Sequence, residues 1–330
     1  MFWIGLFLAG VLLSVMDAAP LAMAVFPVPV AVLWARGRRG AAAVAALCGA
    51  FSVLAGQLVI ALAAADPGTV AMLGAGAFIL AAATLAVAGL GAPLGEMTRR
   101  GHSFGQCVAV LALAMFALAA LETALFWDES RQAWTVMINQ RIAQMEQGAG
   151  GTSPYGDPMR WFDTHLPYLV FGVYFAGMLL AATLQVAAAF RWLRNGADAA
   201  DSPPPVGKFK LMRPPETLVW LAIAAALLGL ADYQWPSDTL RFLSWNTGAA
   251  LAAVYWLNGV GIALCAMEAF GMRAGTAWGV LGLMLLFGLH NGLAVIGLFD
   301  TWFDQRLGAQ RLAAAWRDRN KDDGPQGPEE

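Results

Sequence analysis

The chain has 330 residues, of which 59% are hydrophobic and only 13% are charged, with a net charge of −2 at pH 7. Soluble domains carry roughly 45–50% apolar and about 25% charged residues, so the composition excludes an ordinary soluble protein. The near-neutral charge also offers no basic surface for nucleic acid. We therefore predict an all-α, polytopic membrane helical bundle.

Uncharged runs predict where the chain crosses the membrane, because a helix needs about 20 apolar residues to span a bilayer. The runs are 1–16, 18–35, 40–65, 67–95, 103–121, 166–190, 217–231, 242–267 and 274–299. They predict about eight or nine transmembrane segments. Pro20, Pro27 and Pro29 interrupt the first region, where we expect short, broken helices. Run 217–231 would rise only about 22 Å, which is marginal for a crossing.

Lysine and arginine gather in three groups on one predicted face, which we assign to the cytoplasm. The groups are Arg36, Arg38 and Arg39; Arg99 and Arg100; and Arg191, Arg194, Lys208, Lys210 and Arg213. The basic tail conflicts with this assignment, because one crossing for every run after Arg39 leaves the C-terminus outside. A re-entrant 217–231 segment would reconcile the two and place the tail in the cytoplasm.

Two hydrophilic stretches divide the chain. Residues 1–194 are predicted to form N-terminal membrane helices, with an extracytoplasmic segment at 128–165 whose apolar residues recur at three- and four-residue steps. A proline-rich linker at 195–216 precedes the C-terminal membrane helices at 217–300. Residues 301–330 read as an amphipathic and then disordered tail.

Polar residues inside apolar runs are candidate sites, because each needs a partner or a water-filled cavity. Asn258 lies near the middle of run 242–267, and His290 and Asn291 lie a little beyond the middle of 274–299. Antiparallel packing of these two segments would place the three side chains in one layer, to which Asn246 and Tyr255 add an amide and a ring. Two interpretations stay open. The layer forms a ligand pocket, or its amides only hydrogen-bond across the helix interface.

Sequence patterns of known catalytic sites are absent. The three histidines, His102, His165 and His290, fall in separate segments without a metal-binding pattern, and no nucleophile elbow or phosphate loop is present. We expect no catalytic residue, no metal and no other cofactor.

The end of the last apolar run carries a charged motif. Asp300, Asp304 and Arg306 place two carboxylates at the i,i+4 spacing of a helix beside a cation. A clasp at the membrane interface and a cation site both fit this motif, and we favour the clasp.

The C-terminal half resembles a known family. The stretches are "FKLMRPPETLVW" at 209–220, Asn246, "VYWLNGVGIAL" at 254–264 and "LGLMLLFGLHNGLAVIGLFDTWFDQR" at 281–306. Together they resemble the YybS-like family of uncharacterised bacterial multipass membrane proteins. That family is distantly similar to the substrate-binding (S) subunits of energy-coupling-factor transporters. The resemblance implies a multi-pass protein of the bacterial cytoplasmic (inner) membrane.

Two functions follow as expectations. The first is small-molecule binding or transport, with a pocket between the last two membrane spans. The alternative is a non-catalytic membrane scaffold or assembly factor. In either case the partners are the lipid bilayer and a membrane or cytoplasmic protein, namely a transporter module or an assembly complex, and not nucleic acid.

Overall fold

A computed structural model describes residues 7–8, 11, 25–63, 77, 80–125, 136, 140, 143, 156–195 and 209–322. These residues form helices and the connections between them, without a β-strand. The predicted all-α class is therefore confirmed for this part of the chain. The chain divides into two compact units: Met1–Ala117 with Met178–Lys208, and Leu118–Gly177 with Phe209–Glu330.

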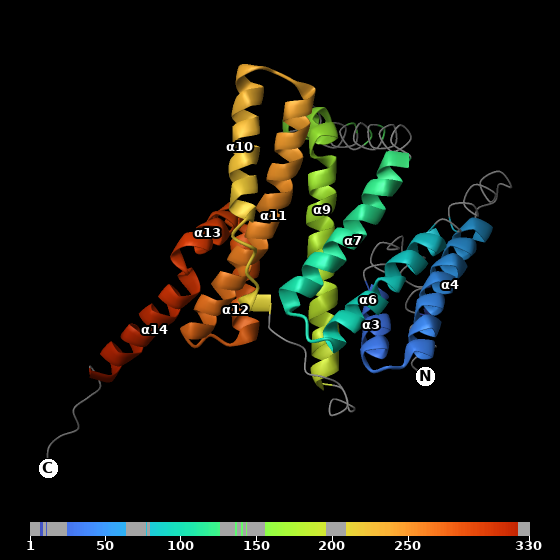
Figure 1. Ribbon diagram of the computed structural model, residues 1–330, viewed down its shortest axis with the longest axis horizontal. Helices are drawn as coiled ribbons and strands as arrows, with labels where there is room; N and C mark the ends of the chain where they lie inside the picture. The colour runs from blue at the N-terminus through green and yellow to red at the C-terminus, as the bar shows by residue number, and fades with distance from the viewer. Residues whose placement is uncertain are drawn as a thin grey trace, which may run out of the picture. The chain divides into compact units, whose positions relative to one another are not determined.

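The first unit contains α3 (Pro27–Ala35), α4 (Arg39–Ala63), α6 (Gly91–Arg99) and parts of α7 (Phe104–Leu125) and α9 (Gly156–Asn195). Helix α3 is only nine residues long and begins with Pro27 at a position that needs no amide hydrogen. It lies against α6 (Figure 1), where a Cβ on Gly91 would collide with the Pro27 carbonyl oxygen. The short helix expected around these prolines is present, and residues 12–24 lie outside the described part.

Five helices among the described residues are long and apolar enough to cross a membrane, or up to six if one bent pair is counted as a single span. The five are Arg39–Ile60, Leu80–Arg99, Phe104–Leu121, Tyr168–Asn195 and Asp238–Ala269. The polytopic class follows from these helices. The total of eight or nine stays a prediction, since parts of the N-terminal runs are outside the described residues. Helix α9 begins at Gly156, so the last part of the expected 128–165 segment is helical.

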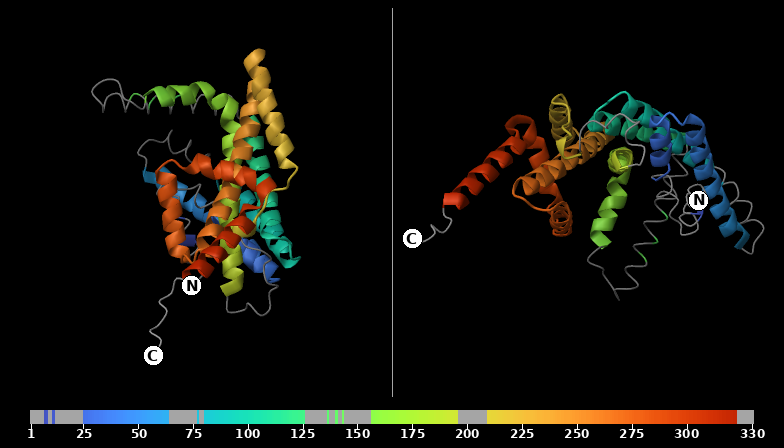
Figure 2. Two further views of the ribbon diagram at one scale, coloured as in Figure 1. Left: turned by 90° about the vertical axis from the view of Figure 1, so that its left-hand side faces the viewer. Right: turned by 90° about the horizontal axis from the view of Figure 1, so that it is seen from below.

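The second unit is built around α11 (Asp238–Ala269), a helix of 32 residues. Helix α10 (Leu218–Gln234) runs antiparallel beside its first half, as both views show (Figures 1 and 2). Val219 packs on Tyr255 near the start of α10, and Asp232 pairs with Arg241 near its end. The start of α10 therefore lies level with the middle of α11.

The chain before α10 completes this path. The short 3-10 helix η2 (Phe209–Leu211) packs against α11 beyond Tyr255, and the Lys210 ammonium forms an ion pair with Glu268. Residues 209–234 thus follow the length of α11 in an irregular first part and a helical second part. The marginal run 217–231 is the helical part of a longer path, and the expected re-entrant turn is not found there.

The reversal lies further along the chain. Helices α12 (Ala274–Leu286) and α13 (His290–Phe303) are separated by a bend of 114°. Gly288, at a φ of +76°, adopts the left-handed conformation that glycine accepts without a Cβ clash. Run 274–299 is therefore interrupted, where the sequence predicted one continuous span. Figure 2 shows α12, α13 and α14 (Gln305–Asp322) as separate helices.

Helices α13 and α14 run in opposite directions along α11. On α13, Leu293 lies against Gly259 and Gly297 lies against Tyr255, so α13 proceeds towards the start of α11. On α14, Arg306 contacts Asn258 and Gln310 contacts Cys265, so α14 proceeds towards the end of α11. The chain thus returns to the end of α11 from which α12 departs.

Candidate functional site

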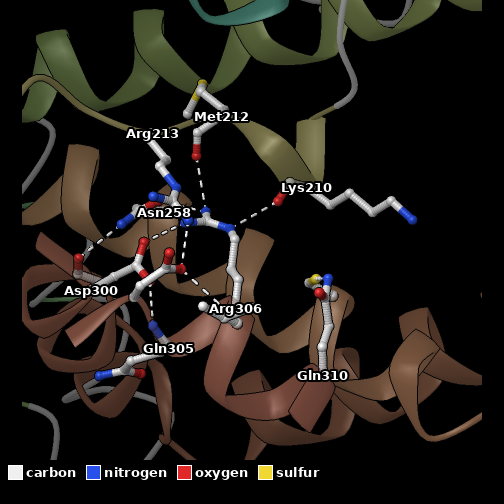
Figure 3. Close-up of polar contacts among 12 residues, drawn as sticks. Lys210, Met212, Arg213, Asn258, Asp300, Gln305, Arg306 and Gln310 are labelled. Atoms are coloured by element: carbon white, nitrogen blue, oxygen red, sulfur yellow. Dashed lines mark hydrogen bonds and ion pairs between the residues drawn. The ribbon is translucent and has the colours of Figure 1, made fainter. Parts of the chain in front are cut away.

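A buried polar cluster lies where α11, α13 and α14 meet, and it centres on Asn258 (Figure 3). Asn258 is 1% exposed. Its Oδ1 accepts a hydrogen bond from Arg306 Nη2 at 2.7 Å, and its Nδ2 donates to the Gly297 carbonyl oxygen at 2.8 Å. Both ends of the amide are therefore occupied by groups of the chain itself.

Arg306, at the N-terminus of α14, is 3% exposed and makes four hydrogen bonds. Besides Asn258, it donates from Nε to the Lys210 carbonyl oxygen at 3.1 Å, from Nη2 to the Met212 carbonyl oxygen at 2.9 Å, and from Nη1 to the Asp300 carboxylate. A guanidinium has five N–H donors in a planar fork. It thus satisfies two backbone carbonyls of the irregular segment before α10, one amide and one carboxylate.

Two aspartates stabilise the turn that positions Arg306 in the cluster. Asp300 is 6% exposed and accepts from the backbone N–H of Gln305 at 2.9 Å through its second oxygen. Asp304 follows the end of α13 with φ 38° and ψ 62°, the left-handed conformation that aspartate tolerates better than most residues. The helical i,i+4 spacing expected for this motif is therefore wrong, because α13 ends at Phe303. The turn at Asp304 is what brings Arg306 back onto Asp300.

Two glycines let α11 and α13 touch backbone to backbone. A Cβ on Gly259 would collide with the Leu293 carbonyl oxygen, and one on Gly297 would collide with the Tyr255 carbonyl oxygen. This close approach, which small residues permit in membrane helices, brings the Gly297 carbonyl within reach of Asn258. It also leaves no room for a ligand between these two helices at this level.

Two ion pairs flank the cluster. Arg213 Nη2 donates to Asp304 Oδ1 at 2.6 Å, and Lys210 pairs with Glu268. The side chains of Arg213 and Asp304 are 52% and 44% exposed. The buried Arg306–Asp300 pair, with side chains 4% and 2% exposed, belongs to a different class.

The depth of the cluster follows from α11. Its 32 residues rise about 48 Å, against a hydrocarbon layer of about 30 Å. Wherever a stretch of about 20 residues is placed within the uncharged run 242–267, that stretch contains Asn258. Arg306 and Asp300 are buried beside this residue of the apolar run. Charged groups within a bilayer are costly, so the pair is a candidate functional position.

Asn246 and Asn291 are not part of the cluster around Asn258. Asn246 Oδ1 accepts from the backbone N–H of Gly172 on α9 at 2.7 Å, so this amide joins two helices. Asn291 is exposed, and the side chain of His290 lies outside the described residues. The structure therefore does not place Asn291 with Asn258, whose two amide bonds go to Gly297 and Arg306.

Tyr255 is 3% exposed and packs with Val219 and Leu251 between α10, α11 and α13. Within the described part of the chain, its hydroxyl has no hydrogen-bond partner. Buried polar groups are normally paired, so this hydroxyl marks a position where a polar group from outside the chain would be favourable.

Sequence reasoning missed the two carbonyl acceptors, Lys210 and Met212. They are separated from Arg306 by 96 and 94 residues, and a backbone carbonyl leaves no trace in the residue types. The charged motif at 300–306, which contains Asp300 and Arg306, was the available signal in the sequence. Among the described residues, no three His, Cys, Asp or Glu side chains are grouped to hold a metal ion.

Long apolar helices, a charged cluster buried at their level and interrupted helices around it define a polytopic α-helical membrane protein. The family comparison agrees: a model described as a predicted membrane protein (DUF2232) matches residues 57–301. The chain belongs to this family of predicted membrane proteins. No curated protein and no solved structure matches it. The resemblance to YybS-like proteins and to transporter S subunits stays a prediction.

Proposed function

We propose that the protein binds or transports a small molecule in the membrane through its α10–α14 region. The carrying observation is the Arg306–Asp300 pair, buried at the level of Asn258 where α10 and α14 begin and α13 ends. Interrupted helices near the middle of the bilayer are the usual framework of transporter sites. Irregular backbone at that depth is tolerated where it is buried in protein or lines a cavity.

The cluster has the properties of a closed state. Asn258 and Arg306 are occupied by groups of the chain, so the polar layer is sealed. Opening of the site would require the α13–α14 turn to rearrange. In the closed state, the contacts of Asp300 and Asp304 hold this turn in place. A ligand site then lies beside the cluster, around the Tyr255 hydroxyl, which has no hydrogen-bond partner among the described residues.

A ligand screen tests this proposal. The purified full-length protein is heated with vitamins, nucleobases and lipid carriers. Unfolding is followed as the loss of the monodisperse peak in size-exclusion chromatography. A ligand at about 100 times its Kd adds about 2.7 kcal/mol of stability. Tyr255→Phe should unfold normally without ligand but weaken the ligand effect, and His290→Ala tests the position expected from the sequence. A wide screen without a stabilising compound contradicts the proposal.

A scaffold or assembly factor is the second candidate, favoured by the exposed apolar side chains of α14, Leu312 and Trp316. On this view a membrane or cytoplasmic protein partner docks on the C-terminal helix. Crosslinking in the native membrane, followed by purification, should recover the same partner repeatedly and lose it when 305–330 is deleted. An uncrosslinked monomer in every preparation contradicts this candidate.

The finer assignments rest on the resemblance. A bacterial inner membrane, and a transporter module as the partner, follow from likeness to the YybS-like family and the S subunits. Such likeness carries fold better than function. The division at the proline-rich linker 195–216 likewise stays a prediction.

A further inference from the structure

We propose that α14 rests on anionic lipid headgroups at the membrane surface where α11 ends. This proposal goes beyond small-molecule binding and does not depend on it. It starts from the path of α14, which begins beside Asn258 and runs towards the end of α11. The helix therefore leaves the hydrocarbon layer together with α11.

One face of α14 is held by α11. Ala313 is fully buried, Gln310 Nε2 lies 3.8 Å from Cys265 Sγ, and the Trp316 and Phe270 rings meet edge to face with centroids 6.4 Å apart. Phe270 directly follows α11. Trp316 is consequently level with the end of α11, the depth at which tryptophans of membrane proteins gather.

Trp316 lies at the edge of this face, and the surface of α14 beyond it is exposed and amphipathic. Leu312 and Trp316 are 64% and 52% exposed and lie one turn apart on the same face. Arg311 and Arg317 are also exposed. An apolar stripe bordered by arginines is the pattern of a helix that lies in a membrane interface.

Charge favours an anionic lipid surface as the occupant. Residues 311–321 contain four basic residues, Arg311, Arg317, Arg319 and Lys321, and one acidic residue, Asp318. The acidic Asp322 and Asp323 come only afterwards in the sequence. The positive band thus lies at headgroup level, where each lysine or arginine gains about 1 kcal/mol from anionic lipids, a factor of about five in affinity.

The same contacts also indicate on which side of the membrane α14 emerges. Lys210, which pairs with Glu268, and Arg273, which precedes α12, lie at the end of α11 from which α14 emerges. Basic residues of short loops mark the cytoplasmic face. The reversal at Asp304, and not a re-entrant 217–231 segment, then brings the tail to the cytoplasmic side and removes the conflict in the crossing count.

Amide hydrogen exchange of the full-length protein in lipid nanodiscs tests the proposal. Discs of phosphatidylcholine are compared with discs that also contain phosphatidylglycerol, and exchange in α11 serves as the internal control for folding. We expect exchange in 307–322 to slow by about fivefold per engaged arginine in the anionic discs. High salt should reduce the difference.

Two paired variants separate charge from packing. Arg311→Gln with Arg317→Gln should remove most of the lipid dependence, and Arg311→Lys with Arg317→Lys should retain it. Equal exchange in both kinds of disc overturns the proposal. Slow exchange that ignores both lipid charge and the glutamine variants also overturns it, because contacts with α11 would then be sufficient.

Discussion

Asn246 and Asn258 occupy the same helix and hold neighbouring backbones in different ways. Asn246 accepts from the Gly172 N–H and donates to the Phe242 carbonyl, so its partners are neutral groups of regular helices. Asn258 donates to the Gly297 carbonyl and accepts from the Arg306 guanidinium at the turn between α13 and α14. One amide reinforces a helix contact, and the other is part of a charged network.

The difference shows where stability depends on an exact set of partners. An isolated hydrogen bond between membrane helices contributes only about 0.6 kcal/mol on average, because the separated helices find other partners. A buried charge has few alternatives, and removing one member of its network leaves the rest unpaired. We therefore expect substitutions at the α13–α14 turn to lower the free energy of unfolding more than equivalent substitutions at the α9–α11 contact.

Arg306→Ala should have the largest effect. It leaves Asp300 buried without its cation and strips the Lys210 and Met212 carbonyls of their donor, at a cost of about 3–5 kcal/mol. Unfolding in mixed micelles, followed by circular dichroism, measures the change. Arg311→Ala is the matched control on the exposed side of the same helix and should stay within about 0.5 kcal/mol.

A double variant sharpens this prediction. Asp300→Asn with Arg306→Gln removes both charges, so its cost should be smaller than the sum of the two single variants. Additive costs would mean that the two side chains do not depend on each other, contrary to the pairing in the structure.

Gly297→Ala comes next, with an expected cost of about 3 kcal/mol, since the new methyl group would collide with the Tyr255 carbonyl and push α13 off α11. Gly292→Ala on the same helix is the control, because nothing lies within 4 Å of its added Cβ. The free energy of unfolding of both variants is compared with that of the unaltered chain. Equal effects of the two alanines would refute the close α11–α13 approach.

The two asparagines give the direct comparison. Asn258→Ala should cost about 2 kcal/mol, in the range for a hydrogen bond to a charged group, and Asn246→Ala about 0.6 kcal/mol. Both are measured by the same unfolding assay. A larger loss at Asn246 would invert the distinction drawn between the two contacts.

The sequence predicted the long helices and the residues of the charged motif, and missed the turns. Run 242–267 marks α11 because apolar length alone determines a long membrane helix. Gly288 breaks run 274–299, but in a chain with 36 glycines a single glycine is a weak signal. The left-handed Asp304 has no pattern of its own. From the sequence alone, which does not reveal that turn, Asp300 and Arg306 were therefore expected to lie on one helix.

The partners of Asn258 were unpredictable for a related reason. Depth along two adjacent runs suggested His290 and Asn291, because antiparallel helices of equal length would align them. The bend between α12 and α13 shifts that register and brings Gly297 to Asn258 instead. Arg306 reaches the same amide from 48 residues away, through a reversal that hydropathy does not record.

Tyr255→Phe should have the smallest effect on stability, and for this reason it is the most informative about function. The hydroxyl is buried without a partner among the described residues, so its removal relieves a desolvation cost while the ring keeps its packing on Val219 and Leu251. Unfolding in micelles should show no loss, or a gain of about 1 kcal/mol. A loss above that size in the absence of ligand would mean that the hydroxyl already has a partner. The α10–α11–α13 core would then be closed at Tyr255 as it is at Asn258.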